Sequence, residues 1–192
     1  MTALLEISGL DVYYGDFQAL FGVGLRVERG QALALVGANG AGKTTLLRTI
    51  AGAISPARGT IRYDGEDMTT AAAYRRIRRG IALVPEGRRL FASLTVEENI
   101  LVGAAAAASA AWPLERIYEI FPLIARRRRH RASQLSGGEQ QAVAIARALA
   151  AAPTRMFSST VRLGKRRRPS GTSAMPRRMR RCAAAVVMSS PS

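Results

Sequence analysis

Cysteine and long apolar runs are both scarce in this sequence. The single cysteine, Cys182, excludes an internal disulfide and fits a reducing compartment. The longest uncharged stretch, 100–114, is mostly alanine and is too short to span a bilayer. The first residues lack the basic region and the apolar core of a secretory signal peptide. We therefore expect a cytoplasmic protein that reaches a membrane only through a partner.

Acidic residues are missing from one end of the chain. Residues 1–153 contain 19 Lys and Arg and all 13 Asp and Glu, whereas residues 154–192 contain 10 basic residues and no acid. The net charge of +16 therefore comes mostly from the last part of the chain, which weakens a nucleic-acid interpretation of the rest. Hydrophobic residues make up 48% of the 192 residues, enough for the core of one α/β domain.

A glycine-rich segment carries the strongest motif, Gly37-Ala38-Asn39-Gly40-Ala41-Gly42-Lys43-Thr44, which matches G-x-x-x-x-G-K-[ST] at every fixed position. The apolar run 31–36 predicts a buried strand before it, and 45–51, closed by Gly52, predicts a helix after it. Glycines let backbone N–H groups approach an anion closely. Lys43 offers a charge to the β- and γ-phosphates, and the Thr44 hydroxyl is placed to bind Mg²⁺. This pattern indicates a nucleoside triphosphate site rather than an empty turn.

A second pair of glycines lies in Leu135-Ser136-Gly137-Gly138-Glu139-Gln140. Ser136 and Glu139 form a capping-box pattern, which predicts a helix from about 137 to 151. Two glycines at a helix N-terminus let an anion approach the free N–H groups. On this chemistry alone, a second phosphate site and an ordinary capped helix remain equally open.

The remaining elements follow from local patterns. Alternating apolar residues predict strands within 5–14 and around 25–27, and a strand at 60–63 ends in an Asp-Gly hairpin turn. We also expect a short basic helix at 71–79, a buried strand at 81–84, a helix capped by Thr95 and Glu98, and a helical segment from Pro113 to Phe121. The only histidine, His130, lies in the basic cluster 126–131, which we interpret as a solvated helix end without a catalytic role.

The two glycine motifs, about ninety residues apart, make residues 3–153 resemble the nucleotide-binding subunits of ABC transporters. The resemblance implies an α/β P-loop NTPase core with an antiparallel β subdomain, a helical subdomain at about 87–136, and ATP and Mg²⁺ as ligands. Tyr14 stands where the family stacks an aromatic ring on adenine, and Glu86 where it contacts Mg²⁺ and the attacking water. The residues implied to bind ATP and Mg²⁺ are therefore Tyr14, Gly37, Ala38, Asn39, Gly40, Ala41, Gly42, Lys43, Thr44, Thr45 and Glu86, with Thr44 and Glu86 at the metal.

The segments 84–91 and 94–99 are similar to those of the branched-chain amino acid importer subgroup, whose second ATPase subunit typically has Glu at the position of Glu86. The resemblance implies pairing with a second ATPase subunit, as a homodimer or heterodimer, on permease subunits at the inner face of the membrane. A substrate-binding protein would act indirectly. The residues Leu135, Ser136, Gly137, Gly138, Glu139 and Gln140 would then contact ATP held by the partner.

The family pattern stops after Pro153. The family continues with a strand ending in Asp-Glu, then a loop Asp and a switch His, but residues 154–192 contain none of these residue types, so no catalytic residue is identifiable there. The segment is rich in Arg, Ser, Pro and Ala. It is either a basic arm for nucleic acid or an anionic membrane, or the product of a shifted reading frame. We favour the shifted frame, expect a disordered tail, and do not favour nucleic acid as a partner.

Loss of a central strand would leave apolar surface uncovered along Leu33, Leu35, Leu46 and Ile81, so we expect marginal stability and aggregation. Three functional hypotheses remain open. The first is an importer ATPase subunit, truncated and at best weakly hydrolytic. The second is a non-catalytic ATP-binding or regulatory subunit that completes an intact partner's site. The third is a nucleic-acid-binding protein acting through the tail.

Overall fold

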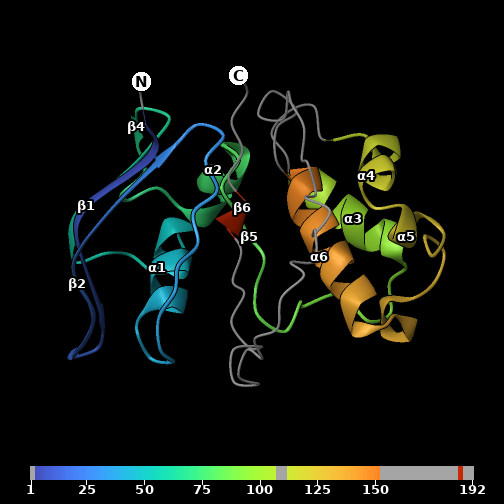
Figure 1. The fold of residues 1–192 in the computed structure, drawn as a ribbon, viewed down its shortest axis with the longest axis horizontal. Helices are drawn as coiled ribbons and strands as arrows, with labels where there is room; N and C mark the ends of the chain where they lie inside the picture. Colours follow the sequence, from blue (N-terminus) through green and yellow to red (C-terminus); the bar gives the residue numbers. More distant parts are fainter. Residues whose placement is uncertain (1–2, 107–111, 152–185, 188–192) are drawn as a thin grey trace, which may run out of the picture.

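The computed structural model describes residues 3–106, 112–151 and 186–187. Figure 1 shows two groups of elements side by side: strands β1 to β4 with helices α1 and α2 in one, and helices α3 to α6 in the other. Each group has its own hydrophobic cluster. Across the described residues, none of the helices has both the length and the apolar character needed to cross a membrane.

The first group is built on an antiparallel sheet. Strand β1 (Ala3–Tyr14) pairs with β2 (Phe17–Glu28) and β3 (Arg58–Tyr63), and β4 (Glu66–Asp67) completes the order β2-β1-β3-β4. The turn between β3 and β4 is the expected Asp64-Gly65 pair, with φ of 51° and 79°. The strands predicted within 5–14, around 25–27 and at 60–63 are confirmed as parts of β1, β2 and β3. Apolar residues on one face of β1 are fully buried.

Helix α1 (Lys43–Ile50) lies against this sheet. Leu46 and Ile50 are buried in one cluster with residues of β1 and β3 and with Ile81. The prediction that Leu46 and Ile81 would be uncovered is therefore wrong, because the sheet and α1 bury both. Leu35 is partly buried, whereas Leu33 is 45% exposed, as expected.

The buried strand predicted at 31–36 is also wrong. These residues have no regular secondary structure, and Val36 is 87% exposed. A strand needs neighbours that pair with its N–H and C=O groups. Within the described ranges no strand pairs with 31–36, so the segment runs as an irregular, largely solvated approach to the glycine loop.

Helix α2 (Ala73–Arg78), in the first group, is followed by β5 (Ala82–Leu83), which lies between the two groups in Figure 1. The helix predicted at 71–79 is confirmed. The strand predicted at 81–84 is reduced to two residues, although Ile81 and Val84 beside it are buried. β5 pairs antiparallel with β6 (Val186–Val187), whose two residues are the described part of the segment 154–192. The disorder expected for the rest of that segment lies outside the described residues.

The second group is helical. Its elements are α3 (Val96–Ala105), α4 (Leu114–Ile120), α5 (Pro122–Ala125), the 3₁₀ turn Ala132–Gln134 and α6 (Gly137–Ala151). Thr95 caps α3 with the expected capping box: its backbone N–H donates to Glu98 Oε2 at 2.7 Å, and Glu98 N–H donates to Thr95 Oγ1 at 3.2 Å. The hydrophobic cluster joins α3, α4 and α5 to α6 as far as Ala150, and the helical subdomain at about 87–136 stays a prediction.

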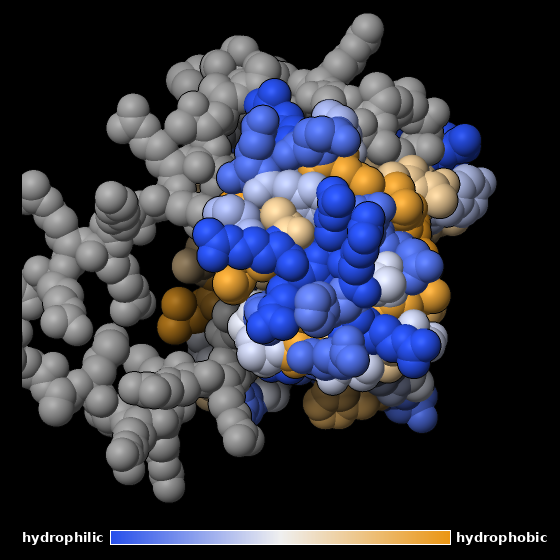
Figure 2. Space-filling model, turned by 90° about the vertical axis from the view of Figure 1, so that its right-hand side faces the viewer, coloured by the Kyte–Doolittle hydropathy of each residue, from blue (hydrophilic) through white to orange (hydrophobic). Residues whose placement is uncertain are grey.

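Figure 2 shows the face of the molecule on the side of α4 and α5, where hydrophilic side chains fill the centre. The arginines at 126–129 and 131 and His130 are all exposed. His130 Nε2 lies 3.2 Å from Arg127 Nη1. The solvated position expected for this histidine is confirmed.

Candidate functional site

The glycine loop is held in place by strand β2. Gly42, the N-cap of α1, has φ of 80°, a left-handed conformation that disfavours side chains. A Cβ at this position would lie 2.6 Å from Leu20 Cδ2 and 3.0 Å from the Ala19 carbonyl oxygen. The exit of the loop into α1 therefore requires glycine for both its backbone angle and its space.

The Lys43 side chain folds back over the loop. Its Nζ donates hydrogen bonds to the carbonyl oxygens of Gly37, at 2.8 Å, and Ala38, at 2.7 Å. Residues 37–41 are otherwise exposed. The loop thus places a full positive charge next to exposed backbone groups at the start of a helix, where the helix dipole also favours an anion.

A cavity of about 720 Å³ opens beside this loop. It brings together three candidate residues from separate parts of the chain: Tyr14 from β1, Thr44 from α1 and Glu86 from the loop after β5. The cavity is lined by Tyr14, Thr44, Leu47, Arg48, Ala53, Ile54, Leu83, Val84, Pro85, Glu86, Gly87 and Arg89. Its position next to the glycine loop gives room for a ligand larger than a phosphate alone.

Two oxygen donors meet in this cavity. Thr44 Oγ1 donates to Glu86 Oε1 at 3.5 Å, so both oxygens face the same small region. A hydroxyl and a carboxylate suit Mg²⁺, which usually takes one or two protein oxygens and completes its shell with water and phosphate. Among the residues that the structure describes, no group of three or more His, Cys, Asp and Glu could hold a metal by itself. The pair therefore fits Mg²⁺ that arrives with a nucleotide.

Tyr14 stands at the rim of the cavity. Its hydroxyl lies 3.4 Å from Thr45 Oγ1, which anchors one end of the ring next to α1. The side chain is 46% exposed, while Thr45 is buried at 8%. An exposed ring beside the cavity can stack on a planar base, and Thr45 positions that ring from below the surface.

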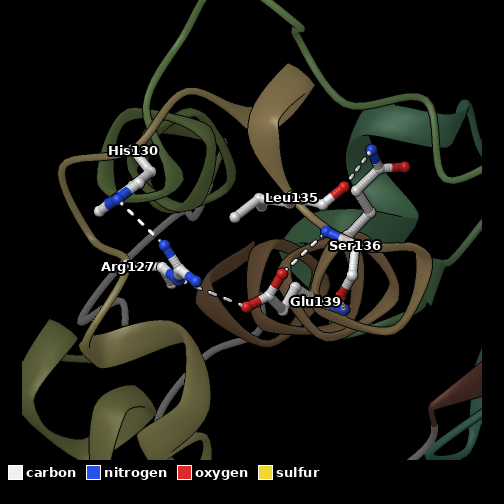
Figure 3. A network of polar contacts seen from close by, with 6 residues as sticks. Arg127, His130, Leu135, Ser136 and Glu139 are labelled. Carbon is white, nitrogen blue, oxygen red and sulfur yellow. Dashed lines mark hydrogen bonds and ion pairs between the residues drawn. The ribbon is translucent and has the colours of Figure 1, made fainter.

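The second glycine motif forms the turn before α6 (Figure 3). Ser136 N–H donates to Glu139 Oε2 at 2.8 Å, and Glu139 N–H approaches Ser136 Oγ at 3.4 Å, which confirms the predicted capping box. The Ser136 backbone N–H, and to a smaller extent the Ser136 hydroxyl, lower the pKa of Glu139. Arg127 Nε lies 3.6 Å from Glu139 Oε1, and Gly137 and Gly138 are exposed.

The turn and the cavity are separate features of this chain, since none of the residues 135–140 lines the cavity. One connection between them was not indicated by any motif. Arg88, next to the cavity lining, donates from Nη1 to Gln140 Oε1 at 3.0 Å. The two residues are 52 positions apart, and neither belongs to a local pattern that would pair them.

A glycine loop that matches G-x-x-x-x-G-K-[ST] and leads into a helix, beside a cavity with oxygen donors for a metal, is typical of P-loop nucleotide-binding domains. Within that class, the chain matches the ABC transporter family over residues 20–157, and it belongs to this family.

Known proteins are similar to the chain over most of its length. It is 41% identical over 163 residues to the high-affinity branched-chain amino acid transport ATP-binding protein BraG of Pseudomonas aeruginosa, a match that covers 84% of this chain and 70% of BraG. It is 43% identical over 162 residues to the Fe(3+) ions import ATP-binding protein FbpC of Mesorhizobium japonicum, covering 81% of this chain and 44% of FbpC.

The fold is similar to that of a solved nucleotide-free ATP-binding cassette from an ABC transporter. The TM-score is 0.68 at 27% identity, over 78% of this chain and 66% of that chain. The expected family and fold are therefore confirmed. The chain spans 70% of BraG and less than half of FbpC.

Proposed function

We propose that this chain is the ATP-binding subunit of an ABC importer and that it binds Mg-ATP in the cavity beside the glycine loop. The observation that carries this proposal is the convergence of Tyr14, Thr44 and Glu86 on one cavity, next to the glycine loop over which Lys43 folds. Together these residues match three parts of Mg-ATP: the Lys43 charge suits phosphate, the Thr44 and Glu86 oxygens suit the metal, and the Tyr14 ring suits the base.

The residues take distinct roles. The loop N–H groups and Lys43 bind the β- and γ-phosphates, and Lys43 exchanges its bonds to the Gly37 and Ala38 carbonyls for phosphate oxygens. Thr44 and Glu86 hold Mg²⁺, which when bound neutralises charge on the phosphate oxygens. Tyr14 stacks on adenine, and its bond to Thr45 fixes the ring at the rim.

The transported substrate is proposed to be a branched-chain amino acid. The similarity to BraG and the glutamate at position 86 support this assignment. The similarity to FbpC, which is named for iron, shows that related chains serve other importers. This chain would bind permease subunits at the inner face of the cell membrane. A substrate-binding protein would act on this chain only indirectly, through the permease subunits.

The turn at Ser136 is proposed to act on a partner. Its exposed glycines and ordered capping box present N–H groups at the start of α6, as a second phosphate contact requires. Because the turn does not line this chain's own cavity, we assign it to ATP held by a second ATPase subunit. The pair would be a homodimer or a heterodimer.

Hydrolysis needs a base or a water-positioning group beside the γ-phosphate. Residues 140–192 contain no Asp, Glu or His, so no residue there can fill that role in the family's usual position. We propose that the chain alone binds ATP and turns it over weakly at best. The ordered turn at Ser136 favours a second role, in which this chain completes the site of an intact partner.

Titration with the fluorescent analogue MANT-ATP tests nucleotide binding directly. We expect saturable, Mg²⁺-dependent binding that Lys43→Ala weakens roughly a hundredfold, because charge-assisted bonds to phosphate are lost. Equal binding by the wild type and the variant would contradict the assigned site. Phosphate release measured with and without an intact partner ATPase subunit then separates the catalytic role from the completing role.

The origin of residues 154–192 has its own test. We propose that a shifted reading frame produced this segment, since the family match ends at residue 157 and the composition changes after Pro153. The nucleotide sequence beyond codon 153 should then encode, in another frame, an apolar strand that ends in Asp-Glu. Absence of such a frame would favour a selected basic arm.

A further inference from the structure

Three consecutive residues after Glu86 have positive φ: Gly87 at 73°, Arg88 at 63° and Arg89 at 44°. Glycine adopts this conformation freely, but arginine does so at a conformational cost. Such residues keep their geometry only where the surroundings hold them. Gly87 and Arg89 line the nucleotide cavity, so the strained segment forms part of its wall.

Two contacts from α6 hold the segment. Arg147 Nη1 donates to the Arg89 carbonyl oxygen at 2.9 Å, and Nη2 donates to the Arg88 carbonyl oxygen at 3.2 Å. The same guanidinium lies over the Phe91 ring, 5.8 Å from its centroid. The backbone of the cavity wall is therefore fixed by the helix that begins at the Ser136 turn.

The side chain of Arg88 makes the second connection. Nη1 donates to Gln140 Oε1 at 3.0 Å, while Gln140 Nε2 donates to the carbonyl oxygens of Leu135, at 3.1 Å, and Ala132, at 3.3 Å. The Gln140 amide thus joins Arg88 to Leu135, the first residue of the turn Leu135–Gln140. A Cβ at Gly137 would lie 3.1 Å from Arg88 Nη2, so the guanidinium packs against the turn itself.

We infer that Arg88 is a positioning residue that connects the nucleotide cavity to the turn Leu135–Gln140 through the Gln140 amide. The inference rests on the proposed binding of Mg-ATP at Thr44 and Glu86. Glu86 lies two residues before Arg88 and directly precedes the strained segment. A change in the position of Glu86 when it contacts Mg²⁺ therefore reaches Arg88, and from there the turn that faces a partner's nucleotide.

The geometry argues for positioning rather than phosphate binding by Arg88. Its Nη1 is committed to Gln140, and Arg88 is not among the residues that line the cavity. A direct phosphate ligand would be needed for nucleotide affinity. A positioning residue would leave affinity unchanged and alter only the response of the turn.

Hydrogen–deuterium exchange on the full chain tests the connection, with peptides that cover 86–91 and 135–141, with and without Mg-AMP-PNP. The variants Arg88→Met and Gln140→Met remove the donor and the acceptor and keep side-chain length. Arg88→Lys keeps a donor at this position and is the matched control. MANT-ATP titration of every variant reports affinity separately.

We expect the nucleotide to slow exchange in both segments of the wild type. Arg88→Met should bind MANT-ATP with wild-type affinity, and both Met variants should keep the response at 86–91 but lose it at 135–141. The double variant should lose no more than either single one, and Arg88→Lys should retain the response. Retention of the response at 135–141 in Arg88→Met would overturn the inference, as would loss of nucleotide affinity in that variant.

The failure of the proposed function has a different signature, since it would appear as no MANT-ATP binding by the wild type. In that case, hydrogen–deuterium exchange of the nucleotide-free chain tests the connection between Arg88 and the turn Leu135–Gln140. Exchange at 135–141 should be faster in Arg88→Met than in Arg88→Lys if the bond orders the turn. Equal exchange rates in those two variants would overturn the inference.

Discussion

Thr44 Oγ1 lies 3.5 Å from Glu86 Oε1, although 42 residues separate the two in the chain. The phosphate loop and the loop after β5 are thereby brought to the same point of one cavity. A hydroxyl and a carboxylate at this distance can both reach one Mg²⁺ ion. The dependence of nucleotide binding on Mg²⁺ therefore tests whether Thr44 and Glu86 act together at the metal.

Substitution at Glu86 should change that metal dependence. We expect Glu86→Ala to weaken MANT-ATP binding in the presence of Mg²⁺ by roughly tenfold, because the ion loses one oxygen partner. Glu86→Gln retains an oxygen and should lose less. The measurement is a titration with Mg²⁺ and with EDTA. If Glu86→Ala binds as tightly as the wild type in Mg²⁺, Glu86 does not contact the metal.

Two glycines of the loop form a matched pair. Gly40 and Gly42 have similar φ, 86° and 80°, but a Cβ at Gly40 would meet no described atom within 4 Å, whereas one at Gly42 would meet Leu20 and Ala19. Gly40→Ala should therefore cost about 1 kcal/mol of unfolding free energy, from backbone strain alone. Gly42→Ala should cost roughly 3 kcal/mol, because overpacking adds to strain. Urea unfolding measures both, and equal costs would show that the contact with β2 does not matter.

The C-terminal end of α1 is held by a buried arginine. Arg76, 1% exposed, donates from Nη1 to the carbonyl oxygens of Thr49, at 2.7 Å, and Ile50, at 2.9 Å. Its other nitrogens donate to the carbonyl oxygens of Ala71 and Thr69, and burial lowers its pKa. The negative end of the helix dipole and these carbonyls compensate the buried charge.

Replacement of this arginine should destabilise the fold. Arg76→Met keeps much of the side-chain volume but leaves buried carbonyl oxygens without donors, so we expect a loss of about 3 kcal/mol in unfolding free energy. The desolvation that lowers the pKa of Arg76 reflects the same burial. Arg78→Met, on the exposed side of α2, is the matched control and should change stability little. Equal urea midpoints for the two variants would contradict the role assigned to Arg76.

The capping box at the Ser136 turn predicts a pH dependence with a definite sign. Hydrogen bonds from the Ser136 N–H and hydroxyl hold the pKa of Glu139 below its ordinary value of 4.5. A lowered pKa in the folded state means that this stabilisation is complete above the ordinary value and is lost as the pH falls through the folded-state value. The urea midpoint of the wild type should therefore exceed that of Glu139→Gln at pH 7, and the difference should shrink as the pH falls below 4.5.

Glu119→Gln, which removes an exposed carboxyl from α4, is the control for a general change of charge. Its midpoint should follow the wild type across the same pH range. A difference between the wild type and Glu139→Gln that stays constant from neutral to acidic pH would show that ionisation of Glu139 does not stabilise the turn.

Local chemistry made much of this fold predictable. The helix starts at Thr95 and Ser136 followed from capping boxes, and the β3–β4 turn followed from Asp64-Gly65, because each pattern acts within a few residues. The phosphate loop was likewise identifiable from a short motif, and Glu86 from the family resemblance. The resemblance also implied that Thr44 and Glu86 bind the same metal ion. The structure brings the two residues together in one cavity.

The failures share a physical cause, since each depends on partners distant in sequence. The segment 31–36 has an apolar strand pattern, but a strand forms only beside a pairing neighbour. Leu46 and Ile81 are buried by a sheet whose packing the local pattern does not specify. The bond from Arg88 to Gln140 depends on a backbone with positive φ at arginine, which sequence propensity disfavours.

This chain is proposed to bind ATP and to turn it over weakly at best on its own, and the fate of the bound nucleotide is the direct test. The purified chain is incubated with Mg²⁺ and ATP labelled at the γ-phosphate, separated from free nucleotide, and its bound nucleotide is identified by chromatography. We predict that the bound nucleotide is intact ATP, that Lys43→Ala retains almost none, and that released phosphate stays at the level of that variant. Multiple turnovers of phosphate release by the wild type alone, abolished in Lys43→Ala, would contradict the account.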